Sequence, residues 1–219
     1  MTTSGGGWAS AVLFAVVLVL ATMLASTRLG EVRLTRPPRT AVVLWLLIAV
    51  PSLLQIAVPA VLDALERDPD QIRDHQWWRI FTSVAVQDGG VAGTVVNLLV
   101  LAWVAPLAVR VWGGVRAVLL FVASQIIFGL FTAFLFPSPG AGNSGATLAL
   151  AASFAGLVVM QSKDRRVLAA SGGIVLAGVL LVVVDDAHGL AVLTGALLGA
   201  ALATVSPPTG DPTDRVRTL

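Results

Sequence analysis

The sequence contains no cysteine among its 219 residues, which excludes disulfides, thiolate metal sites and a cysteine nucleophile. Charge is also scarce. Only 12% of the residues are charged, whereas 57% are hydrophobic, and the mean hydropathy is +0.90. A soluble globule of this length needs more polar surface than this composition provides. Lipid must therefore cover much of the chain.

The chain lacks the charge pattern of a nucleic-acid-binding protein. Its pI is about 10.4, but its net charge is only +2, and no basic stripe with interleaved aromatic residues occurs. We therefore predict no nucleic-acid partner. Without cysteine, and with a single histidine in the apolar segments, the sequence predicts no metal or organic cofactor.

Long uncharged runs alternate with short charged clusters, as in membrane helices joined by loops. A helix needs about 20 apolar residues to cross the hydrocarbon core, because it rises about 1.5 Å per residue. The sequence therefore predicts an all-α polytopic membrane protein. The predicted spans are Trp8–Ser26, Thr40–Leu62, Ser83–Val109, Val115–Phe136, Ser144–Met160, Val167–Val184 and His188–Val205.

The first apolar segment is compatible with a cleaved signal peptide or with a retained helix. Small residues from Ala21 to Thr27 offer a cleavage point, but no positive charge precedes the segment and four arginines follow it, which is the reverse of a signal peptide. We interpret residues 1–39 as a transmembrane helix with an arginine-rich cytoplasmic loop. Residues 40–205 form the membrane domain, and the polar residues 206–219 are predicted to be a disordered cytoplasmic tail.

Lysine and arginine gather in alternate loops, and short basic loops stay on the cytoplasmic side of a membrane. The arginine-rich first loop, Arg110 with Arg116, the stretch 163–166 and the tail share one side, and the loops between them are acidic or uncharged. This pattern predicts a multi-pass protein of the cell membrane with a cytoplasmic C-terminus. It places the starts of the fifth and seventh spans at the outer face.

Ser144 and His188 begin those two spans, in a region where each polar group costs free energy. A serine hydroxyl becomes a nucleophile when a base within hydrogen-bond reach takes its proton, and the shared depth permits such a pair. Two structural interpretations remain open. The small residues around Ser144 are also ordinary packing material, and a histidine at a helix end is often an interfacial residue.

Four other polar residues are interpreted as boundary residues. Gln87 and Asp88 are expected at the outer membrane boundary, and Asp185 and Asp186 are expected to end a helix in water. Asn97 lies inside its span, where its amide must find partners.

Small residues follow both helices of the candidate pair. In the last span four residues share one face, since they recur at helical spacing: His188, Ala191, Gly195 and Gly199. The fifth span is similarly slim because of its small residues, which are Gly142, Gly145, Ala146, Ala149, Ala152 and Gly156. Such faces let two membrane helices approach closely. The pattern favours contact between the fifth and seventh spans.

Together these motifs resemble the rhomboid family over residues 40–205. In that family a Trp-Arg pair closes the first outer loop, an Asn follows a Gly pair, a Gly-x-Ser-Gly motif carries the nucleophile, and a His precedes glycines in the last helix. The resemblance implies a six-helix core, to which the first span adds an extra helix. The matching residues are Trp78 with Arg79, Gly89 with Gly90 and Asn97, Gly142 to Gly145, and His188 with Gly195.

By this resemblance Ser144 is the nucleophile and His188 the general base, with no required third carboxylate. Asn97 and the backbone N–H of Ser144 would donate to the oxyanion of the tetrahedral intermediate. Three positions depart from the family pattern. Gly93 stands where a second His is common, Asp88 replaces an earlier His, and Val109 replaces a Glu.

The resulting hypothesis is an intramembrane serine endopeptidase whose substrates are transmembrane proteins within the lipid bilayer. The rival hypothesis is a catalytically inactive rhomboid-like protein that binds membrane helices, and Gly93 and Val109 favour it. A transporter or channel needs a continuous polar path. The inner halves of the spans are almost wholly apolar, which argues against both.

Overall fold

The computed structural model describes residues 7–30 and 36–208. Within these ranges seven helices are long and apolar enough to cross a membrane. The predicted all-α polytopic fold is confirmed. The seven helices are α1 Gly7–Leu29, α2 Arg39–Ala57, α6 Gly90–Trp112, α7 Gly114–Leu130 with a π-helical continuation Phe131–Leu135, α8 Ser144–Gln161, α9 Arg165–Val183 and α10 His188–Val205.

Two predicted spans are wrong at the ends that flank the loop between them. The span expected to reach Leu62 ends at Ala57, because the following Val58–Pro59 step breaks the helix and proline lacks the N–H that would continue it. The span expected from Ser83 begins only at Gly90, whose φ of 62° suits glycine. The predicted tail lies mostly on residues 209–219, outside the described residues, and the domain bounds stay a prediction.

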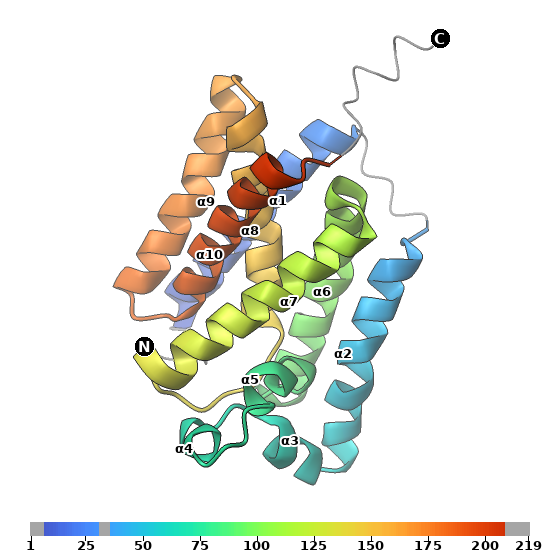
Figure 1. Cartoon of the computed structure of the whole chain (residues 1–219), viewed down its shortest axis with the longest axis vertical. Helices are drawn as coiled ribbons and strands as arrows, with labels where there is room; N and C mark the ends of the chain where they lie inside the picture. The colour runs from blue at the N-terminus through green and yellow to red at the C-terminus, as the bar shows by residue number, and fades with distance from the viewer. Residues whose placement is uncertain (1–6, 31–35, 209–219) are drawn as a thin grey trace.

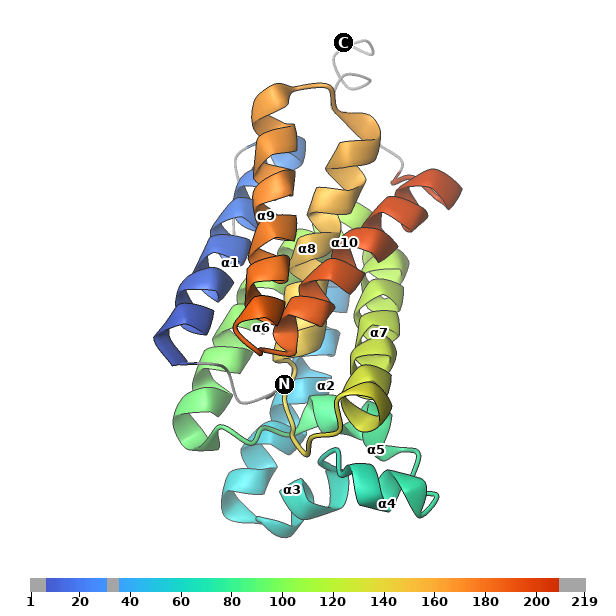
Figure 2. The same cartoon turned by 90° about the vertical axis from the view of Figure 1, so that its left-hand side faces the viewer.

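The loop between α2 and α6 folds over one end of the bundle (Figure 2). It contains α3 Ala60–Leu65, α4 Pro69–Arg73 and α5 Arg79–Thr82. Arg79 is buried, and its Nη1 donates to the backbone carbonyls of Asp63 and Glu66, each at 2.9 Å. Its neighbour Trp78 is half-exposed. The Trp-Arg pair therefore organises this loop through the arginine.

Helix α8 forms the centre of the molecule. It is buried along most of its length and contacts α1, α6, α7, α9 and α10 (Figure 1). The helices α1, α6, α8 and α10 all begin at the end of the bundle that carries α3, α4 and α5. Ser144 and His188, the first residues of α8 and α10, therefore lie at the same end.

Helices α8 and α10 approach so closely that only glycine fits at three positions. A Cβ on Gly195 would collide with the backbone of Ala149, and one on Gly199 would collide with the backbone of Ser153. From the other side, a Cβ on Gly156 would collide with the backbone of α10. The predicted contact between the two helices is confirmed through Gly195 and Gly199 of α10 and Gly156 of α8, whereas Gly145 faces the Phe128 ring of α7.

Helix α1 packs against α9, α8 and α6 (Figure 2). Val17, Leu24 and Ala25 are fully buried against these neighbours. Trp103 on α6 donates its indole N–H to the Thr22 hydroxyl at 3.0 Å. The extra helix is therefore an integral layer of the bundle.

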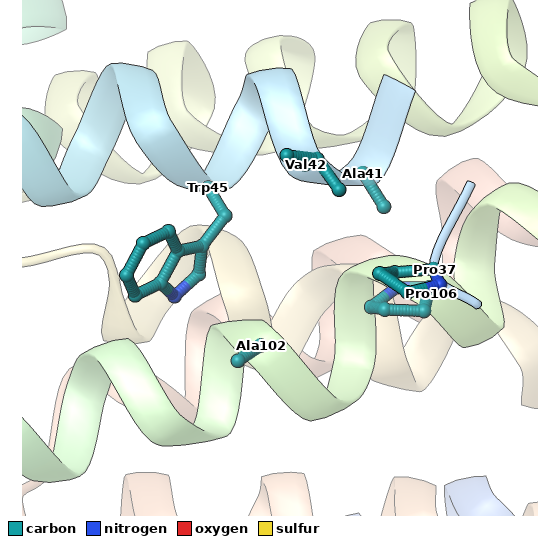
Figure 3. A pocket seen from close by; sticks show the side chains of 6 residues that line it. All are labelled: Pro37, Ala41, Val42, Trp45, Ala102 and Pro106. Atoms are coloured by element: carbon teal, nitrogen blue, oxygen red, sulfur yellow. The ribbon is translucent and has the colours of Figure 1, made fainter. Parts of the chain in front are cut away.

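A hollow of about 170 Å³ lies between parts of α2 and α6, toward the end of the bundle away from Ser144. Figure 3 shows the indole of Trp45 pointing from α2 toward α6 near Ala102, with Pro37 beside Pro106. The Trp45 indole donates to the Leu98 carbonyl at 2.9 Å, which fixes this edge of the hollow. Its lining is almost wholly apolar, so it offers no groups for chemistry.

The α8–α10 contact predicts the effect of one added methyl group. Gly199→Ala should lower the free energy of unfolding by about 1–3 kcal/mol, because overpacking at a rigid backbone forces the helices apart. Gly172→Ala is the matched control, since Gly172 also lies inside a helix and a Cβ there meets nothing within 4 Å. Chemical unfolding in detergent measures both variants. Equal stabilities would contradict the close approach.

Candidate active site

The nucleophile candidate lies at the first residue of α8. Ser144 is half-buried, and its backbone N–H lies in the first helical turn, where amides have no acceptor within the helix. The preceding Gly142 has a φ of 148° and donates its N–H to the Ser83 carbonyl at 2.9 Å. This hydrogen bond ties the turn before α8 to the segment that precedes α6.

The hydroxyl and the imidazole lie within hydrogen-bond distance. Ser144 Oγ is 2.8 Å from His188 Nε2, and the His188 side chain is buried. Two aromatic rings hold the imidazole: Phe14 of α1 edge-on, with the ring centroids 5.1 Å apart, and Phe128 of α7 with centroids 5.6 Å apart. A Cβ on Gly145 would collide with the Phe128 ring, so glycine is needed beside the serine.

Asp186 contacts the other side of the imidazole, so its interpretation as a residue ending a helix in water is wrong. It has no exposed surface, and its Oδ1 lies 2.7 Å from His188 Nδ1 and 2.9 Å from the His188 backbone nitrogen. Burial raises the pKa of Asp186, but the hydrogen bonds and electrostatic attraction of His188, together with a hydrogen bond from the Ser10 hydroxyl of α1, outweigh burial and lower that pKa to about 2. The carboxylate is therefore ionised at neutral pH.

Gln87 is also not a boundary residue but the centre of a buried amide network. Its Oε1 accepts from Asn97 Nδ2 at 2.7 Å, and its Nε2 donates to Asn143 Oδ1 at 2.9 Å and to Ser52 Oγ at 3.1 Å. Its backbone exchanges two hydrogen bonds with the Gln55 amide. The network joins α2, α6 and the loop before α8, and it fixes the orientation of the Asn97 amide.

Gly142 lies between the candidate nucleophile and the amides of Asn97 and Gln87. A point one Cβ bond from Gly142 would lie 3.4 Å from Asn97 Nδ2, 3.5 Å from Ser144 Oγ and 3.2 Å from Gln87 Oε1. Asn97 carries two N–H groups, of which one serves Gln87. The structure therefore brings the Asn97 amide and the Ser144 hydroxyl to the same side of Gly142.

The three positions that depart from the family pattern, Gly93, Asp88 and Val109, lie in different surroundings. Gly93 lies one turn before Asn97, and a Cβ built on it would meet no atom within 4 Å. Because glycine has no side chain, this position donates no side-chain hydrogen bond. Asp88 is exposed and accepts the Ala141 N–H at 3.0 Å, which ties the loop before Ser144 to α6. Val109 lies near the opposite end of α6, within the apolar core.

A buried arginine links the loop before α6 to the loop before α8. Arg67 and Gly140 exchange two backbone hydrogen bonds of 2.9 Å, and the Arg67 guanidinium lies over the Phe128 ring, 5.8 Å from its centroid. Burial lowers the pKa of Arg67 to about 10, which still leaves it charged at neutral pH. This pairing holds the loop that precedes Ser144.

Within the described part of the chain, no three His, Asp or Glu side chains gather as a metal site. The chemistry available at this end of the bundle is that of a hydroxyl, an imidazole, a carboxylate and amide donors. Neither Gln87 nor Asp186 carried a distinctive signal in the sequence. Each has a polar neighbour that is exposed, and only the tertiary structure separates the buried residue from the exposed one.

The class of protein follows from this arrangement and from comparison with known families. The family model for the rhomboid domain matches residues 74–208, which is more than half of the chain. The chain therefore belongs to the rhomboid family and is a multi-pass membrane protein. No curated protein matches it by sequence.

The amide network generates a second prediction. Gln87→Ala should lower the free energy of unfolding, because each buried group left unpaired costs about 1–3 kcal/mol. Asn97, Asn143 and Ser52 all lose a partner in this variant. Gln161→Ala removes an exposed glutamine from the far end of α8 and should leave stability unchanged. Similar unfolding curves for both variants in detergent would refute the network's importance.

Proposed function

We propose that this protein is an intramembrane serine endopeptidase that hydrolyses a peptide bond in or near a transmembrane helix of its substrate. The observation that carries the proposal is the 2.8 Å separation between Ser144 Oγ and His188 Nε2 at the ends of two membrane helices. Membership of the rhomboid family supports the same activity.

The reaction begins with His188 as general base. Its Nε2 takes the Ser144 proton while Oγ attacks the carbonyl carbon of the scissile peptide bond. The resulting oxyanion accepts hydrogen bonds from the Ser144 backbone N–H and from Asn97 Nδ2, near the positive end of the α8 dipole. His188 then gives its proton to the leaving amine, and the C–N bond breaks.

The second half of the reaction reverses these roles. Water attacks the Ser144 acyl ester and gives a proton to His188, and the ester bond breaks as Oγ recovers a proton. The two products are a new carboxyl end and a new amino end of the substrate. Asn97 and the Ser144 N–H serve the second oxyanion as they serve the first.

The basic residues at the opposite end of the bundle support an orientation. Arg110, Arg116 and Lys163 lie at or beyond the far ends of α6, α7 and α8. Positive charge favours the cytoplasmic side, so Ser144 and His188 face the outer side of the cell membrane and the C-terminus is cytoplasmic. Water reaches the site from that outer side.

A second candidate function is a catalytically inactive rhomboid that binds membrane helices without cleaving them. The open space at Gly93 favours it, since loss of one oxyanion donor costs on the order of 10²–10³ in turnover. The two functions differ in one observable. Only the protease depends on the Ser144 hydroxyl.

Ser144→Ala should reduce cleavage of a model transmembrane substrate in proteoliposomes by at least about 10³-fold, because the nucleophile is lost. Ser162→Ala is the matched control, since Ser162 follows the other end of the same helix, and it should cleave like the wild type. Product fragments are measured by mass spectrometry. Equal cleavage by the wild type and by Ser144→Ala would overturn the proposal.

Gly93→His should raise kcat about 10-fold or more, because an imidazole one turn before Asn97 would supply a further oxyanion donor. Gly93→Ala controls for the gain in helix propensity, which is about 1 kcal/mol and does not touch the oxyanion. Initial rates in the same proteoliposome assay compare the two variants. A His variant no faster than the Ala variant would count against this view of the oxyanion site.

A further inference from the structure

The buried carboxylate of Asp186 contacts Nδ1 of His188, the ring nitrogen that does not face Ser144. Asp186 Oδ1 accepts from both the ring Nδ1 and the backbone N–H of His188, and Asp186 has no exposed surface. The resemblance to the family implies a Ser-His pair alone. The carboxylate is therefore an additional feature of this chain's site.

The extra helix α1 encloses this carboxylate. Ser10 is buried and donates its hydroxyl to Asp186, and Phe14, one turn further along, packs edge-on against the His188 ring. Both contacts come from outside the six-helix core. Helix α1 thus supplies one hydrogen bond to Asp186 and one aromatic contact to the His188 ring.

The pairing determines which ring nitrogen carries the proton. An ionised carboxylate only accepts hydrogen bonds, so Nδ1 must be the protonated nitrogen and Nε2 presents its lone pair. That lone pair faces Ser144 Oγ, as a general base requires. When His188 takes the serine proton, the adjacent negative charge stabilises the imidazolium.

A purely structural interpretation of Asp186 is that it caps the start of α10 through the His188 N–H. Asparagine is as good a capping residue as aspartate, and it has the same shape. A cap therefore survives the change to asparagine, whereas the negative charge does not. This difference separates the two roles.

We propose that Asp186 is a positioning residue that completes a Ser144–His188–Asp186 triad, and that α1 holds the Asp186 carboxylate in place through Ser10. The inference rests on the proposed proteolytic function for its kinetic consequence. Its structural consequence, the tautomer of His188, is independent of proteolysis.

The kinetic test compares Asp186→Asn with Asp185→Asn in the full-length protein. Asp186→Asn should lower kcat by about 10²–10⁴ with KM changed less than about twofold, because substrate contacts are untouched and only the base is affected. Asp185 is exposed and has a φ of 64°, which asparagine tolerates, so its variant should retain wild-type kcat. Equal kcat values for both variants would overturn the proposal.

The tautomer test uses the fact that the chain has only two histidines, His75 and His188. His75 is exposed with a φ of 69°, so His75→Asn leaves His188 as the single reporter in ¹⁵N-histidine NMR of the protein in detergent. The protonated nitrogen should be Nδ1, and Asp186→Asn should shift the population toward Nε2–H. An Nε2–H tautomer of His188 in the protein with Asp186 intact would refute this role of Asp186, even if Ser144-dependent cleavage is observed.

Ser10→Ala provides a second variant if Asp186→Asn does not fold. It keeps the carboxylate and removes one hydrogen bond from α1, so kcat should fall about two- to tenfold with KM unchanged. Cleavage that is lost in Asp186→Asn but insensitive to Ser144→Ala would instead refute the proposed function. The two failures are thus distinguishable.

Discussion

The close approach of α8 and α10 is the constraint on which the site depends. A serine side chain is short, so its hydroxyl reaches an imidazole only where the two backbones nearly touch. Gly156, Gly195 and Gly199 permit that approach, because any Cβ at these positions would meet the opposing backbone. The separation of Ser144 Oγ and His188 Nε2 is a local result of packing along the whole length of both helices.

Buried polar groups impose a second constraint, since each one left unpaired in a membrane protein costs free energy. The groups near Ser144 are satisfied in two separate networks. The amides of Gln87, Asn97 and Asn143 bond one another on the α6 side, and Asp186 bonds His188 on the α10 side. Each network fixes one part of the site. The first orients the amide beside Gly142, and the second orients the imidazole.

The fold could be predicted because the length of each apolar run and the charge of each loop are read directly from the sequence. Neither requires knowing which helices contact one another. The meeting of α8 and α10 was also predictable, since small residues at helical spacing mark a packing face. The sequence does not reveal that Asp186 and Gln87 are buried, because their burial depends on α1 and α2, which are distant from them in the sequence. Adjacent Asp185 and Asp186 are chemically identical, and the buried contacts with Ser10 and His188 belong to Asp186.

The most direct test of the central claim, that His188 activates Ser144, is covalent labelling of the intact protein in lipid nanodiscs with a fluorophosphonate. Mass spectrometry then locates the adduct. The account predicts an adduct on Ser144 that disappears in His188→Ala, because the probe reacts only with an activated serine. Absence of an adduct on Ser144, or labelling at an equal rate without His188, would contradict it.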